Sequence, residues 1–115
     1  MNWYDEIGKK LVKNEIAYNV CYRFDINAIS FDYVNGNTKA EIFIEPKKFH
    51  LIELKEPLNT KTFISIRTSY TPHFFKRVYE YKKLIITPKK IVFVLENYNF
   101  IIDINGIYRE KIFKF

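Results

Sequence analysis

The fold of this chain is decided by residues 29–44, which read ISFDYVNGNTKAEIFI. Apolar and polar residues alternate on both sides of Asn35-Gly36, a pattern typical of two strands that each bury one face. Asn-Gly suits a two-residue β-turn, because both central residues of that turn take positive φ. With this loop, Asp32 lies opposite Lys39 across the two strands. We therefore predict a β-hairpin with one buried face, which contains Ile29, Phe31, Tyr33, Ala40, Ile42 and Ile44.

A helix is predicted before this hairpin, over residues 3–13. Trp3, Ile7 and Leu11 recur at helical spacing and form one apolar stripe. Asn2 precedes the stripe and can cap the first turn.

A second helix is predicted over residues 72–83. Thr71-Pro72 supplies a capping hydroxyl and a proline at the first helical position. Phe74, Phe75 and Val78 then fall on one helical face. The abundance of Val, Tyr and Ile favours a strand instead. The helix is preferred, and the strand remains the alternative.

Short alternating or apolar runs predict the other strands, at residues 49–54, 61–68, 91–95, 100–104 and 107–113. Asn105-Gly106 predicts a second two-residue turn, which sets Ile102 opposite Arg109 and Phe100 opposite Lys111. Such mixed pairs indicate a sheet edge, or cationic side chains whose stems pack along the sheet. The chain is thus predicted to be one α+β domain over residues 1–115, with a mostly antiparallel sheet of about seven or eight strands.

Cationic residues gather in the second half of the chain. The 115 residues carry a net charge of +6, and residues 61–90 contain eight Lys or Arg against a single acid, Glu80. Charge segregated in this way favours a cationic surface that faces an acidic partner. The alternative is a set of solvated lysines and arginines without a common partner.

A candidate site for an anion or an acidic partner lies within this span. In the helix interpretation, the free amides of the first turn face the hydroxyl-rich stretch before Pro72, which is typical of anion binding. The same interpretation puts His73, Lys76 and Arg77 along one side of the helix. An ordinary polar connection between two elements is the alternative. The candidate residues are Arg67, Ser69, Tyr70, His73, Lys76, Arg77 and Lys83.

Signals for catalysis and cofactors are sparse. Three scattered glycines cannot build a phosphate loop, and Cys21, His50 and His73 are too widely spaced for a zinc motif. We therefore predict no catalytic residue, metal or cofactor. His50, within an apolar strand, is expected to be a structural histidine. The sequence has no basic leader and no long apolar run, so we expect a cytoplasmic protein that does not use a membrane.

Three functions compete on these grounds. The preferred one is a non-enzymatic binding module whose residues 61–90 present a cationic, aromatic surface to nucleic acid or a nucleoprotein complex, because bases stack on rings while phosphates pair with cations. The second is a regulator or inhibitor, of the kind encoded by viruses and mobile elements, that docks on a host protein through tyrosines. The third is a small enzyme, for example a nuclease that uses His73 with Arg67, or one that uses a carboxylate-bound Mg²⁺. A homodimer formed through the C-terminal edge strand is a further expectation.

Overall fold

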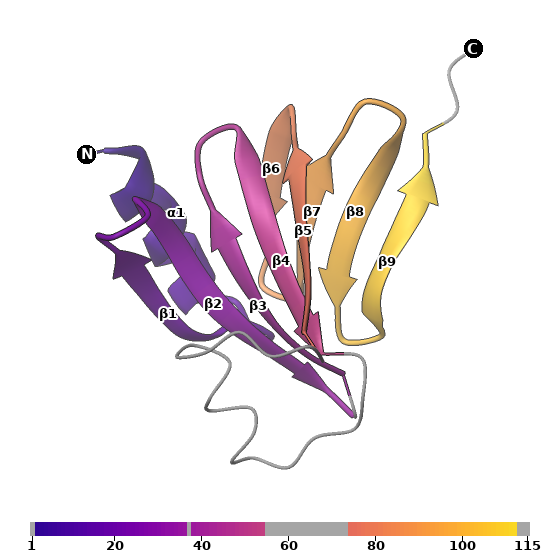
Figure 1. Cartoon of the computed structure of the whole chain (residues 1–115), viewed down its shortest axis with the longest axis horizontal. Helices are drawn as coiled ribbons and strands as arrows, with labels where there is room; N and C mark the ends of the chain where they lie inside the picture. Colours follow the sequence, from indigo (N-terminus) through magenta and orange to yellow (C-terminus); the bar gives the residue numbers. More distant parts are fainter. Residues whose placement is uncertain (1, 37, 55–73, 113–115) are drawn as a thin grey trace.

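The computed structural model describes residues 2–36, 38–54 and 74–112 (Figure 1). These residues form one helix and nine strands in two antiparallel sheets, which confirms the α+β class and exceeds the predicted strand number. The helix is α1 (Trp3–Val12). The first sheet holds, in spatial order, β1 (Tyr18–Arg23), β2 (Ala28–Asn35), β3 (Thr38–Ile44), β4 (Lys48–Leu54) and β5 (Phe74–Glu80). The second holds β6 (Lys83–Ile86), β7 (Lys90–Val94), β8 (Tyr98–Asp103) and β9 (Gly106–Lys111).

Helix α1 confirms the first helix prediction to within one residue. The Asn2 side chain accepts a hydrogen bond from the Asp5 amide at 2.9 Å, which satisfies one free donor of the first turn. Ile7 and Leu11 are buried against the first sheet. The apolar stripe read from the sequence is therefore the face that packs.

The hairpin of β2 and β3 is present, but its register differs from the prediction by two residues. Asn35 pairs with Thr38, so Gly36 and Asn37 connect the strands, and Asp32 lies opposite Glu41 rather than Lys39. Glycine and asparagine are both tolerant of positive φ, so this sequence offers two overlapping turns. A shift of two residues leaves every side chain on its predicted face.

Valine in place of Gly36 is expected to destabilise the protein by about 1–3 kcal/mol. Gly36 has a φ of +58°, which a β-branched residue resists, and a Cβ built there meets nothing within 4 Å, so the cost comes from the backbone alone. Gly8→Ala in α1 is the matched control. Because alanine favours a helix over glycine, this change is expected to raise the free energy of unfolding by at most about 1 kcal/mol. Urea unfolding of both variants tests this, and an unchanged midpoint for Gly36→Val would contradict it.

The second helix prediction is wrong. The described part of that segment, from Phe74, forms β5, which pairs antiparallel with β4 along its whole length. As the edge strand of the first sheet among the described residues, β5 pairs its backbone on one side only, but a strand suits its aromatic and branched residues better than a helix does. Tyr81 and Lys82 then carry the chain into the second sheet. The Tyr81 amide bonds to the Lys47 carbonyl at 3.0 Å, and the Lys82 amide to the Val94 carbonyl at 2.7 Å.

The C-terminal hairpin also differs by two residues from its predicted register. Asp103 pairs with Gly106, so Ile104 and Asn105 form the turn. The Asp103 side chain accepts a hydrogen bond from the Asn105 amide at 2.8 Å, as aspartate does at the first position of a turn. Gly106 follows with a φ of +139°. Arg109 consequently lies opposite Phe100 and not Ile102.

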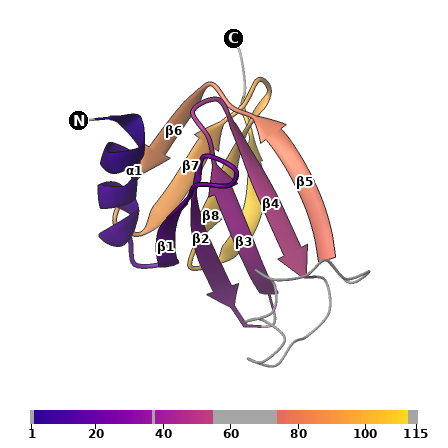
Figure 2. The ribbon, with the colours of Figure 1, turned by 60° about the vertical axis from the view of Figure 1, so that its left-hand side comes forward.

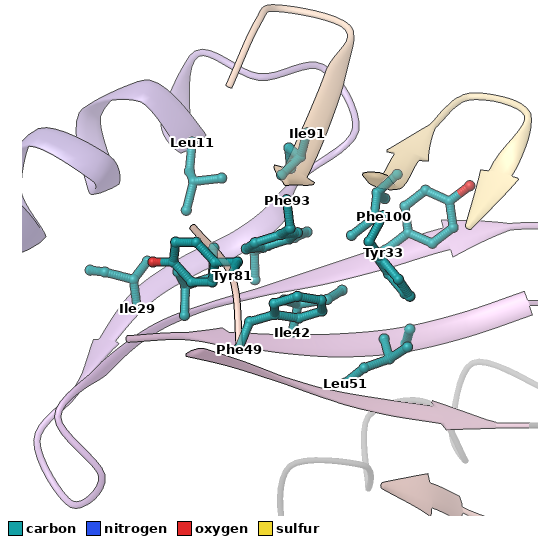
Figure 3. Close-up of a cluster of buried hydrophobic side chains, with 14 of the residues drawn as sticks. Leu11, Ile29, Tyr33, Ile42, Phe49, Leu51, Tyr81, Ile91, Phe93 and Phe100 are labelled. Carbon is teal, nitrogen blue, oxygen red and sulfur yellow. The ribbon is translucent and has the colours of Figure 1, made fainter. Parts of the chain in front are cut away.

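Helix α1 and the second sheet cover the same face of the first sheet (Figures 1 and 2). We call this face, and the facing side of the second sheet, the core faces. Phe49 of β4 and Phe93 of β7 stack with their ring centroids 3.8 Å apart, and Figure 3 shows the side chains of both sheets pointing toward one another. The Tyr33 hydroxyl donates a hydrogen bond to the Asp103 carbonyl at 2.7 Å, which ties β2 to the end of β8.

Buried Asn14 holds the corner where α1 leads into β1. Its side-chain amide donates to the Thr87 carbonyl at 2.6 Å, in the turn between β6 and β7. Its side-chain oxygen accepts from the amides of Ile16 at 2.8 Å and Ala17 at 3.1 Å. One polar side chain therefore joins the helix, the first sheet and the second sheet.

Candidate nucleic-acid interface

Four of the seven predicted site residues lie outside the part of the chain that the structure describes. They are Arg67, Ser69, Tyr70 and His73. The other three, Lys76, Arg77 and Lys83, are described and lie on strands.

The structure does not bring these three together on one face. Lys76 and Arg77 are successive residues of β5, so their side chains point to opposite faces of the sheet. Lys76 lies opposite Ile52 and is exposed, whereas Arg77 lies opposite Leu51, on the core face. Lys83 begins β6 in the other sheet. The expected alignment of Lys76 with Arg77 is wrong, because it required a helix.

A different cationic group forms where the core faces of the two sheets meet at β5 and β9. Arg109 of β9 donates a hydrogen bond to the Tyr79 hydroxyl at 3.2 Å. The Arg109 guanidinium carbon lies 4.9 Å from the centre of the Tyr98 ring and 5.8 Å from that of Tyr79. Both distances are within the range of cation–π attraction. We call this group the arginine–tyrosine cluster, and it comprises Arg77, Tyr79, Tyr98, Arg109 and Lys111.

Strand alternation explains how β9 contributes Arg109 and Lys111 to the arginine–tyrosine cluster. Ile107, Arg109 and Lys111 point to the same side of the strand. Ile107 packs against the core, and Arg109 pairs with buried Phe100, so its stem lies at the rim of the core while its charged end is exposed. Lys111 pairs with Tyr98 in the same ladder.

Tyr79 connects the two arginines. The pKa of Arg77 is raised, first of all by hydrogen bonding to the Tyr79 side chain and in smaller part by the Glu53 carboxylate. Arg109 donates to the Tyr79 hydroxyl, and Arg77 lies two residues before Tyr79 on the same face of β5, so guanidinium groups from both sheets lie beside one tyrosine side chain. Planar guanidinium groups pair with phosphate in a two-pronged way, and they also stack on flat rings.

Some members of the arginine–tyrosine cluster were identified from the sequence, but their contact with one another was not predicted. Arg77 belonged to the predicted site, and the mixed pairs of Arg109 and Lys111 indicated either a sheet edge or cationic stems packed along the sheet. Tyr79 and Tyr98 were assigned no partner. The alternation of residues 107–111 was the available signal, but the meeting of β5 with β9 depends on how the sheets pack.

Other candidate residues have structural roles. His50 and Glu45 form a pair with 2.7 Å between Nε2 and Oε2, as expected for a structural histidine. The Cys21 sulfur contacts the Ser30 hydroxyl at 3.1 Å. Across residues 2–36, 38–54 and 74–112, no three His, Cys, Asp or Glu side chains gather so that they could hold a metal ion.

No protein-family model, curated protein or solved structure matches this chain. Within the residues that the structure describes, no helix is long and apolar enough to cross a membrane.

Proposed function

We propose that this protein is a non-enzymatic binding module that holds single-stranded nucleic acid at the arginine–tyrosine cluster. The placement of Arg77 and Arg109 beside Tyr79, with Arg109 bonded to the Tyr79 hydroxyl, is the observation that supports it. Two adjacent guanidinium groups suit a phosphate, which offers several acceptor oxygens at once. Lys111 adds a third positive charge beside Tyr98.

Single-stranded nucleic acid fits the cluster better than a duplex. Unpaired bases stack on aromatic rings and guanidinium planes, and their phosphates pair with nearby cations. The cluster offers both kinds of group within one short stretch of surface, because Arg109 lies against Tyr98. We propose a cytoplasmic location for this activity, since a chain with a single cysteine suits a reducing compartment.

Replacing both Arg77 and Arg109 with glutamate is expected to weaken binding of a fluorescein-labelled oligothymidylate by at least about tenfold, which corresponds to about 1.4 kcal/mol. Fluorescence anisotropy across a salt series measures this. Three phosphate contacts predict a slope of roughly −2 for the logarithm of affinity against the logarithm of salt concentration, at about −0.7 per contact. The double variant should lose most of that slope.

A control variant carries the same change in charge elsewhere. Lys10 lies on α1 and Lys89 in the turn between β6 and β7, and both are exposed. Lys10→Glu with Lys89→Glu should change affinity by no more than about twofold. Equal losses in the two double variants would mean that net charge alone drives binding. Retained binding in the folded Arg77/Arg109 variant would contradict the cluster as the site.

A protein partner is the second candidate, because tyrosine and arginine are also frequent anchors at protein interfaces. Tyr79 and Tyr98 are half-buried at the rim of the core, where a partner surface could pack. Such an interface depends only weakly on salt, so the same titration separates the two candidates. A second copy of this chain could pair along β9, which lies at one end of the second sheet. Light scattering over a range of concentrations tests that dimer.

A further inference from the structure

A hollow of about 800 Å³ lies between α1 and β1, away from the arginine–tyrosine cluster. We call it the α1–β1 groove. Both elements lie at the same end of the first sheet in Figures 1 and 2. The helix lines one wall, β1 lines the other, and Ile29 of β2 contributes from below. The residues that line the groove include Gly8, Lys9, Val12, Lys13, Val20 and Tyr22.

Gly8 leaves the groove open, although glycine makes the helix less stable than alanine would. A Cβ built on Gly8 would lie 3.8 Å from the Ile29 side chain, which is ordinary contact, and Gly8 has no positive φ. Neither packing nor backbone geometry therefore requires glycine here. Alanine would stabilise the helix by about 1 kcal/mol. The missing side chain instead adds space to the groove.

The groove borders the edge of a sheet. Val20, Cys21 and Tyr22 are successive residues of β1, and all three line the hollow. Cys21 and Tyr22 are regularly paired and point to opposite faces, so a hollow that both line runs along the strand edge, next to the register shift of β1 between Tyr18 and Cys21. In the part of the chain that the structure describes, no strand pairs with the side of β1 that faces away from β2. An edge of this kind can accept the backbone of an added strand.

Aromatic and apolar side chains surround the groove. Trp3, Tyr4, Tyr22 and Phe24 form a ladder of edge-to-face contacts with ring centroids 5.0, 5.2 and 5.0 Å apart. Phe24 is 88% exposed, and Val12 on the facing helix is 71% exposed. Large apolar groups that remain in water beside a hollow are typical of a surface that binds a partner.

The charges along the groove favour an acidic occupant. Lys9 and Lys13 line it toward the end of α1, against the single carboxylate of Asp5 near the start. Lys10 does not line the groove, and its ammonium group lies 3.7 Å from the Glu6 carboxylate. A ligand that follows β1 therefore meets apolar surface beside two positive charges.

We propose that the α1–β1 groove binds an extended, acidic segment of a partner protein, whose apolar side chains enter the hollow while its backbone lies along β1. This proposal goes beyond the nucleic-acid function, because it uses a different surface and different residues. Edge-strand hydrogen bonds would supply affinity, and alternate side chains of the segment would supply specificity.

The probe is a fluorescein-labelled peptide that alternates apolar and acidic residues, acetyl-VEVEFEVE-amide. We expect it to bind in an anisotropy titration and to shift the amide resonances of α1 and β1 in proton–nitrogen NMR spectra. The basic counterpart, acetyl-VKVKFKVK-amide, should bind at least about tenfold more weakly. Gly8→Leu, which fills the hollow, should lower affinity for the acidic peptide by at least about tenfold, whereas Gly8→Ala should change it by less than about threefold.

Charge reversal supplies a second test that does not depend on the packing of leucine. Lys9→Glu with Lys13→Glu should lower the affinity for the acidic peptide by at least about tenfold. Lys10→Glu should lower that affinity by no more than about twofold. Absence of shifts at α1 and β1, or equal affinity of the two peptides, would overturn the proposal. Shifts at α1 and β1 caused by an oligothymidylate and not by the peptide would also overturn it, because the groove would then belong to nucleic acid. Loss of oligothymidylate binding at the arginine–tyrosine cluster would leave these peptide results unchanged.

Discussion

Phe49→Ala is expected to cost about 3–5 kcal/mol of folding free energy. Phe49 is fully buried and lies where the two sheets face each other. Its ring stacks on Phe93 at 3.8 Å and lies 5.1 Å from both Phe100 and Tyr79. Removing it takes away contacts to both sheets and leaves a cavity that they cannot easily close. A domain of this size is stable by only about 5–15 kcal/mol, so much of the stability should be lost.

Urea unfolding followed by circular dichroism measures this loss. Phe49→Leu keeps most of the buried volume and is expected to cost less than half as much as Phe49→Ala. Phe24→Ala removes the same aromatic ring at an exposed position and should change stability by no more than about 0.5 kcal/mol. A loss below about 1 kcal/mol for Phe49→Ala would contradict the stacked arrangement of the two sheets.

Asn14→Leu is expected to cost about 3 kcal/mol, because it removes three hydrogen bonds at a buried position. The Ile16 and Ala17 amides and the Thr87 carbonyl would lose their side-chain partner. Leucine cannot replace these bonds, and each buried polar group left without one costs about 1–3 kcal/mol. The connection of α1 to the turn between β6 and β7 should loosen with it.

Asn14→Asp separates the two halves of this network. Aspartate keeps an acceptor for the Ile16 and Ala17 amides but places a carboxylate against the Thr87 carbonyl. We expect a loss smaller than that of the leucine variant, with faster amide hydrogen exchange in the β6–β7 turn. Equal stability of the leucine variant and the unmodified protein would show that Asn14 is not a structural link.

Local signals predicted the parts of the fold that depend on local chemistry. The capping side chain of Asn2 and the stripe of Ile7 and Leu11 were sufficient for α1, because a helix satisfies its backbone within itself. Alternation likewise predicted which residues of β2 and β3 face the core. It could not fix the register, because a two-residue shift keeps the same alternation and the loop offers two turns with similar chemistry.

Tertiary contacts decided the features that the sequence did not reveal. Helical spacing in residues 74–80 competed with strand propensity, and pairing with β4 determined the outcome. The arginine–tyrosine cluster joins Arg77 to Arg109 through Tyr79, across two sheets. No periodicity in the chain encodes that contact, because it depends on the angle at which the sheets pack. The excess of positive charge in the second half was visible, but its arrangement was not.

The strand order has a consequence for how the chain can fold. Every strand pairing joins two strands that are neighbours in sequence, and all but one of these hairpin connections span two to four residues. The exception is the pairing of Leu54 with Phe74, which joins segments separated by residues 55–73. Among the strand pairings, the addition of β5 to the first sheet therefore carries the largest entropy cost of chain closure. Packing the two sheets together adds contacts of longer range, such as that of Tyr33 with Asp103, so local hairpins and distant sheet packing both contribute to the contact order.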